Sequence, residues 1–146
     1  MKKQITTVVA TLSLFVALAA IGIAGLGTTV TANIPFDFSV SGKTLPAGKY
    51  IVMRGGSQGT LIIRNVETKK AAAAITQDAD TKMNGQANLE FRRYGNQYFL
   101  AKVSDGNGAS ELPVTKAERN ITRGKDHLAV NDSKPETVIV NATVGQ

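Results

Sequence analysis

The chain of 146 residues contains no cysteine and no tryptophan, and its single histidine is His127. Without cysteine it can form no disulfide bond and can carry no lipid at a signal-site cysteine. Zinc sites are built mainly from cysteine and histidine, so His127 alone predicts no zinc site. From these absences we expect no metal, no cofactor and no catalytic residues.

Basic residues outnumber acidic ones, but no stretch of the chain is densely basic. The formal net charge is +6 at pH 7, and Lys2 and Lys3 supply two of the positive charges. A weak preference for anionic surfaces follows, whereas nucleic-acid binding is not indicated. The basic residues of the middle of the chain are scattered: Lys43, Lys49, Arg54, Arg64, Lys69, Lys70, Lys82, Arg92 and Arg93.

The first 27 residues have the layout of a secretory signal peptide. Residues 1–4 are short and basic, residues 5–24 form an uncharged apolar run, and small residues follow. We expect cleavage between residues 24 and 32, and export to the periplasm or the extracellular space. About 20 apolar residues can also span a bilayer, so the alternative is an uncleaved anchor, which would be the only contact with a membrane.

The segment after the signal peptide predicts a half-buried strand. Every second position from Val30 to Val40 is apolar, and most of the positions between them are polar. Pro35 lies on the polar side and removes one backbone donor. We therefore expect either an edge strand or a bulge at Pro35.

Turns rich in glycine and polar residues separate the remaining elements. Four alanines in residues 71–77 favour a helix, but a strand fits this short segment better because it lies between strands. Residues 78–86 and 122–135 are polar and are expected to be loops, and residues 110–121 have helix-forming composition after Pro113. Further strands are predicted at residues 49–54, 60–66, 71–77, 88–94, 97–103 and 136–143.

The clearest supersecondary signal is a hairpin around Gly95 and Asn96. A two-residue turn sets the register of the two strands that it joins. Both faces of the hairpin carry an aromatic residue, so we expect it to be central in the sheet or covered on both sides. The predicted cross-strand pairs are Phe91 with Leu100, Leu89 with Lys102, Arg93 with Tyr98, Arg92 with Phe99 and Glu90 with Ala101.

These elements predict an all-β fold: a small antiparallel sandwich or barrel of about 6–7 strands with one short helix, preceded by an N-terminal signal helix. Residues 28–121 are expected to form the β domain. Residues 122–146 are expected to be a polar C-terminal extension with a last strand at residues 136–143. The predicted core consists of Ile34, Phe36, Phe38, Tyr50, Val52, Leu61, Ile63, Leu89, Phe91, Leu100 and Val103.

Three ordered segments resemble a family of small exported proteins of soil Acidobacteria. They are residues 32–50 (ANIPFDFSVSGKTLPAGKY), residues 91–100 (FRRYGNQYFL) and residues 111–119 (ELPVTKAER). The resemblance implies an exported bacterial β domain and implies no activity, since no function is established for that group. The polar segment after Arg119 is longer than the family pattern.

Two motifs resemble known sites but lack the structure that those sites require. Residues 55–59 match G-x-S-x-G, but a nucleophile elbow needs a helix after it, and residues 60–63 are expected to be a strand. Asp78 and Asp80 begin like a calcium loop, but the sixth position, which should be glycine, is Met83.

The leading hypothesis is therefore an exported, non-catalytic binding or structural module whose partner is an envelope protein or a glycan. Its candidate interaction patch is Arg92, Arg93, Tyr94, Tyr98, Glu118 and Arg119. The same residues could instead form surface ion pairs of little energetic weight. The alternative function is a small hydrolase of glycans, which needs two carboxylates across a cleft, with Asp37, Glu90 and Glu111 as the candidates. The oligomeric state is left open.

Overall fold

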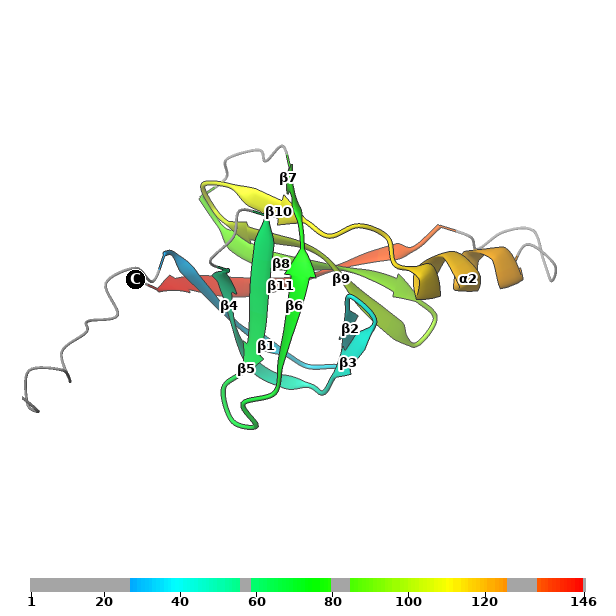
Figure 1. Cartoon of the computed structure of the whole chain (residues 1–146), viewed down its shortest axis with the longest axis horizontal. Helices are drawn as coiled ribbons and strands as arrows, with labels where there is room; N and C mark the ends of the chain where they lie inside the picture. Colours follow the sequence, from blue (N-terminus) through cyan, green and yellow to red (C-terminus); the bar gives the residue numbers. More distant parts are fainter. Residues whose placement is uncertain (1–26, 56–58, 80–84, 126–133, 146) are drawn as a thin grey trace, which may run out of the picture.

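The computed structural model describes residues 27–55, 59–79, 85–125 and 134–145. The expected signal peptide, most of the G-x-S-x-G motif, Asp80 and His127 lie outside the described residues. Within them the chain forms eleven strands and one helix (Figure 1). The elements are β1 (Thr29–Ile34), β2 (Phe38–Val40), β3 (Lys43–Leu45), β4 (Gly48–Arg54), β5 (Thr60–Asn65), β6 (Ala71–Ile75), β7 (Gln77–Ala79), β8 (Ala87–Tyr94), β9 (Gln97–Asp105), β10 (Ala109–Glu111), α2 (Lys116–Lys125) and β11 (Glu136–Gly145).

The strands form one nearly closed, barrel-like sheet. Their order is β3-β2-β9-β8-β11-β1-β4-β5-β6, and every pairing is antiparallel except the single bridge between β2 and β9. β7 follows β6 after Thr76 and pairs with β10, which in turn pairs with β9. The strands that follow β6 therefore lead back to β9, so the sheet is nearly closed. The all-β class expected from the sequence is confirmed.

The strand expected at residues 30–40 is divided at Pro35. Its alternation is correct, because Val30, Ala32, Ile34, Phe38 and Val40 are all buried. The expected edge position is wrong, since β1 pairs with both β11 and β4, while β2 pairs with β3 and β9. Because proline cannot donate to a ladder, residues 35–37 carry the chain from one part of the sheet to the other.

The division at Pro35, which makes β2 a separate strand, and the three further short strands β3, β7 and β10 raise the number of described strands from the expected six or seven to eleven. The last predicted strand is present as β11 and extends to Gly145. It lies inside the sheet, between β8 and β1. Residues 122–125, expected to be loose, are instead the last turn of α2.

The β8–β9 hairpin keeps the expected register only near its turn. Phe91 pairs with Leu100, Arg92 with Phe99 and Arg93 with Tyr98, as predicted. Beyond Phe91, an irregularity shifts the register by one residue, so that Glu90 pairs with Lys102 and Leu89 with Val103. At this point the Ala101 carbonyl accepts a hydrogen bond from the Leu112 amide at 2.7 Å, a tertiary contact that local turn chemistry does not determine.

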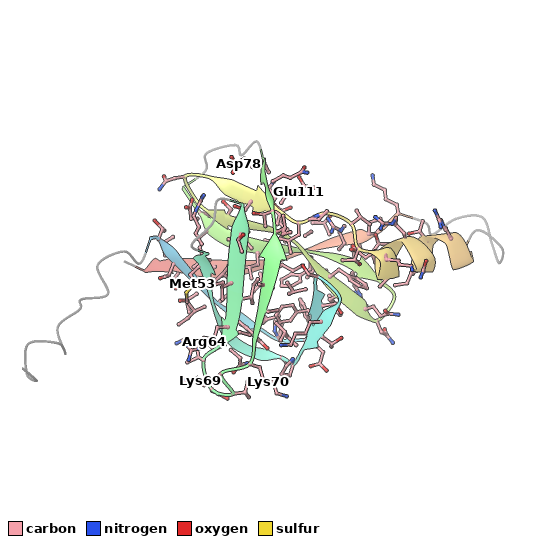
Figure 2. All side chains as sticks on the ribbon, viewed as in Figure 1. Met53, Arg64, Lys69, Lys70, Asp78 and Glu111 are labelled. Carbon is pink, nitrogen blue, oxygen red and sulfur yellow. The ribbon has the colours of Figure 1, made fainter. Side chains whose placement is uncertain are left out.

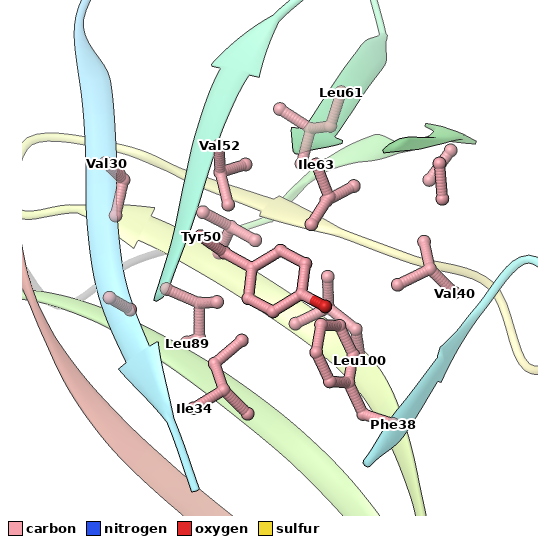
Figure 3. Packing of buried hydrophobic residues seen from close by; sticks show 14 of the residues in the cluster. Val30, Ile34, Phe38, Val40, Tyr50, Val52, Leu61, Ile63, Leu89 and Leu100 are labelled. Atoms are coloured by element: carbon pink, nitrogen blue, oxygen red, sulfur yellow. The ribbon is translucent and has the colours of Figure 1, made fainter. Parts of the chain in front are cut away.

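The inward faces of the strands form one apolar core (Figure 3). Ten of the eleven predicted core residues are buried, and Phe36 is partly buried against them. The Phe38 ring packs edge to face against two other rings, with its centre 5.0 Å from that of Tyr50 and 5.4 Å from that of Phe91. Among the described residues, no helix has the length and apolar composition needed to cross a bilayer.

Candidate functional site

The inside of the barrel is occupied by side chains. A recess at the Arg54 end, lined by Val52, Leu61, Val103 and their neighbours, has a volume of about 20 Å³, which is space for roughly one water molecule. Two open surface recesses, of about 260 and 320 Å³, flank β11. This interior recess is therefore too small for a ligand of sugar or lipid size.

The Arg92–Glu118 ion pair is the centre of the predicted interaction patch. The Arg92 Nε donates to Glu118 Oε1 at 2.6 Å, and the two side chains are 14% and 0% exposed. Arg92 Nη2 also donates to the Leu112 carbonyl at 3.3 Å. This pair fastens helix α2 to the outer face of the hairpin.

Glu118 also closes the N-terminus of α2. Its Oε2 accepts the Thr115 amide at 2.7 Å, and the Thr115 hydroxyl accepts the Glu118 amide at 3.3 Å. This is a capping box, which satisfies two amides that a helix N-terminus leaves unpaired. The sequence signal that could have located it is Thr-x-x-Glu at residues 115–118.

The other predicted patch residues are divided between the two faces of the hairpin, because successive strand residues point to opposite sides. Tyr94 lies on the α2 side, where burial and the Glu118 carboxylate raise its pKa. On the opposite face, the Arg93 guanidinium lies 5.4 Å from the Tyr98 ring centre and 3.2 Å from Glu136 Oε2. Arg119, exposed on α2, donates to the Val114 carbonyl at 2.9 Å.

The structure therefore brings Arg92, Tyr94 and Glu118 together, and it separates them from Arg93 and Tyr98. Tyr98 stacks on Phe36 with ring centres 3.9 Å apart. Most of these side chains already have partners within the chain. A role for the set in binding a partner stays a prediction.

The three candidate carboxylates lie in two places. Glu90 and Glu111 both pair in register with Lys102, so they flank this lysine across three neighbouring strands. Glu90 Oε1 lies 3.8 Å from Lys102 Nζ, and Asp37 accepts the Ala47 amide at 2.8 Å. None of the three carboxylates lines any of the recesses described above.

A cluster of basic residues that are scattered in the sequence lies at one end of the barrel. We call it the basic end, and Figure 2 shows three of its members, Arg64, Lys69 and Lys70, at the β5–β6 turn, away from Asp78 and Glu111. All of its members have exposed side chains: Lys43, Lys49, Arg64, Lys69 and Lys70.

Asn65 builds the turn that presents these cations. Its buried side-chain oxygen Oδ1 accepts hydrogen bonds from the backbone amides of Glu67 and Thr68 at 2.9 and 2.8 Å. The backbone amide of Asn65 donates to the Lys70 carbonyl at 2.8 Å. Asparagine favours such side-chain turns. Lys69 occupies the left-handed region, with φ 59°. The turn thus projects two adjacent lysines from the end of the barrel.

Strand pairing adds the other members of the basic end. Arg64 pairs with Ala71 on β6 and with Ile51 on β4, two residues from Lys49. Lys43 Nζ donates to the Ala71 carbonyl at 2.6 Å across the gap between β3 and β6. These residues are distant in sequence, so only the sheet register brings them together. The acidic residues nearby are Glu67, in the same turn, and Asp37, at the neighbouring turn.

Comparison with known proteins gives no relative: no protein-family model, no curated protein and no solved structure matches this chain. In the described ranges, no group of three or more histidine, cysteine, aspartate or glutamate side chains is placed to hold a metal ion. The function has to be argued from the chain's own geometry.

Proposed function

We propose that this chain is an exported, non-catalytic binding module of the cell envelope or the extracellular space. The observation that carries the proposal is the packed apolar core of the described strands, whose recess at the Arg54 end has a volume of only about 20 Å³. Enzyme and carrier sites are usually enclosed, concave pockets of about 300–1,000 Å³, whereas the recesses of about 260 and 320 Å³ beside β11 are open to the surface. A barrel packed in this way is better suited to binding through its surface.

The contacts that Glu90 and Asp37 make within the chain also favour a binding function over hydrolysis. Glycosidases need one carboxylic acid and one carboxylate facing each other across a bound sugar. Glu90 is instead beside the Lys102 ammonium, and Asp37 holds the backbone of the Pro46–Ala47 turn. For the binding module no residue has to change its protonation state.

Export is tested by fractionating the producing cells and measuring the intact mass of the protein. The expected result is a mass that begins between residues 24 and 32, in the exported fraction. Binding is tested by sedimenting the purified protein with cell envelopes of the producing cells over a range of protein concentrations. Saturable sedimentation is expected without release of small glycan fragments. Release of such fragments, or no sedimentation at all, would contradict the proposal.

A further inference from the structure

We propose that the basic end, formed by Lys43, Lys49, Arg64, Lys69 and Lys70, is a docking surface for an acidic polysaccharide whose repeating units carry carboxylates. This inference rests on the proposed binding function and names its ligand class. It is carried by the gathering of five exposed cations at one end of the barrel and by the ion pairing of the other basic residues of the sheet.

None of the five cations of the basic end has a carboxylate partner among the described residues. Lys43 Nζ and Lys69 Nζ each donate at 2.6 Å to a neutral backbone carbonyl. The side chains of Lys49, Arg64 and Lys70 make no hydrogen bond or ion pair with any described residue. By contrast, the remaining basic residues in the described strands all face a carboxylate: Arg54 with Asp105, Arg92 with Glu118, Arg93 with Glu136 and Lys102 with Glu90. In the described strands, the positive charges without a carboxylate partner are therefore those of the basic end.

The spacing of these cations suits an extended polyanion. Diagonal neighbours on paired strands lie about 7–8 Å apart, so Lys49 on β4 and Arg64 on β5 form a short row. Lys70 follows in the adjoining turn, where its carbonyl accepts the Asn65 backbone amide. A single small anion needs donors that converge in a recess, and none of the recesses described above is lined by more than one of these five residues. Lysine supplies a hydrated point charge without strict geometry, which fits a flexible chain of carboxylates.

Two observations favour a polysaccharide over a lipid bilayer. The exposed large apolar side chains of the described fold, Ile75, Val114, Ile139 and Val144, all lie outside the basic end, so it offers nothing to insert among lipids. The chain also enters β1 at the opposite end, because Thr29 pairs with Met53 whereas Ile34 pairs with Gly48. The five steps along β1 separate these ends by about 17 Å. A bilayer that held an uncleaved N-terminal segment would therefore face the other end of the barrel.

The test uses two variants of the full chain that lose the same charge. The first is the triple variant Lys49→Gln, Arg64→Gln and Lys70→Gln at the basic end. The matched control is Lys116→Gln, Arg123→Gln and Lys134→Gln, three exposed side chains that lie elsewhere on the described fold. Each variant replaces two lysines and one arginine. Their urea unfolding midpoints are compared first, and equal midpoints are expected because all six side chains are exposed.

Affinity for polygalacturonate is then measured at low and at high salt. We expect the basic-end variant to bind about tenfold more weakly than the unchanged protein at low salt, because three exposed ion pairs that together contribute about 1.4 kcal/mol are lost. The control should change less than about twofold, and high salt should weaken all three proteins toward the same low affinity.

Equal losses in the two variants would overturn the inference, because net charge alone would then explain the binding. Failure of the unchanged protein to bind polygalacturonate, or its binding only to phosphatidylglycerol vesicles, would also overturn it. These failures are distinguishable from failure of the proposed function. If the protein still sediments saturably with cell envelopes, the binding module stands and only its assigned ligand class is wrong.

Discussion

Among the described residues, Glu118 is the only charged side chain that is fully buried. Its two carboxylate oxygens have separate partners, because Oε1 accepts from Arg92 and Oε2 accepts from the Thr115 amide. Removing one member of a buried pair leaves the other charge without compensation. Glu118, which was expected to face a partner, thus links α2 to the β8–β9 hairpin within the fold.

Replacing Glu118 with alanine should lower the free energy of unfolding by about 3–5 kcal/mol, because Arg92 would remain buried and unpaired. Thr115→Ala removes only one cap hydrogen bond and should cost about 1 kcal/mol. Urea unfolding of both variants measures the difference. Equal losses would mean that capping alone explains the role of Glu118.

Tyr50 should make the free energy of unfolding decrease at alkaline pH. The residue is fully buried, its hydroxyl donates to the Pro46 carbonyl at 2.6 Å, and burial raises its pKa above the ordinary value of 10.0. As the pH rises, the unfolded chain therefore loses the Tyr50 proton before the folded chain does. The contribution of Tyr50 to the free energy of unfolding is fully present below pH 10 and is lost as the pH rises through the folded-state pKa.

We therefore expect the free energy of unfolding to fall steadily above pH 10. Tyr50→Phe should cost about 1 kcal/mol at neutral pH through the lost hydrogen bond and should make the alkaline fall less steep. Part of the alkaline fall should remain in Tyr50→Phe, because the pKa of Tyr94 is also raised. Unfolding curves between pH 8 and pH 11 measure both effects. An unchanged slope in Tyr50→Phe would contradict this assignment.

At the scale of elements, β11 joins two parts of the sheet. Residues 136–141 pair with β8, and residues 142–145 pair with β1. Val138, Val140 and Ala142 pack against the core from this strand. Without β11, the edges of β1 and β8 would present unpaired backbone groups, which are templates for association with other chains.

A chain that ends at residue 133 should therefore associate into larger species, as measured by light scattering or gel filtration. Adding a synthetic peptide of residues 134–146 should restore the size of the full-length protein by filling the empty position in the sheet. A peptide carrying Val138→Asp and Val140→Asp is the matched control and should not restore it. A truncated chain that stays unassociated without the peptide would contradict this prediction.

Sequence patterns predicted the longer elements well and the connections between them poorly. Alternation located β1, strand-forming composition between turns located β4 and β5, and the two-residue turn at Gly95 and Asn96 located the β8–β9 hairpin. β3, β7 and β10 are too short for any period, and the register shift beyond Phe91 depends on a tertiary contact with Leu112. The basic end escaped prediction for the same reason, because Lys43 reaches Ala71 only through the closed sheet.

For the molecule as a whole, the packed core predicts that no large apolar ligand enters the barrel. Phe91 is one of the largest fully buried side chains and contacts both Phe36 and Phe38, so its loss should open a cavity in the core. Phe91→Ala should lower the free energy of unfolding by about 3–5 kcal/mol.

A small apolar compound such as benzene should raise the melting temperature of Phe91→Ala and leave that of the unchanged protein as it was, since only the variant has a dry cavity. Calorimetry with and without the compound measures this. Stabilisation of the unchanged protein to the same extent would mean that the barrel already holds an accessible ligand cavity.

The pairing of β1 with β11 has a consequence for how the protein is made. The Thr29 hydroxyl donates to the Gly145 carbonyl at 3.1 Å, a contact between residues 116 positions apart. β1 can pair with β4 as soon as both have been synthesised, but its other edge has no partner until β11 has left the ribosome. For a chain that is exported as we propose, the sheet is therefore completed only after residues 136–145 are available, and we expect this delay to favour passage through the translocation channel in an incompletely folded form.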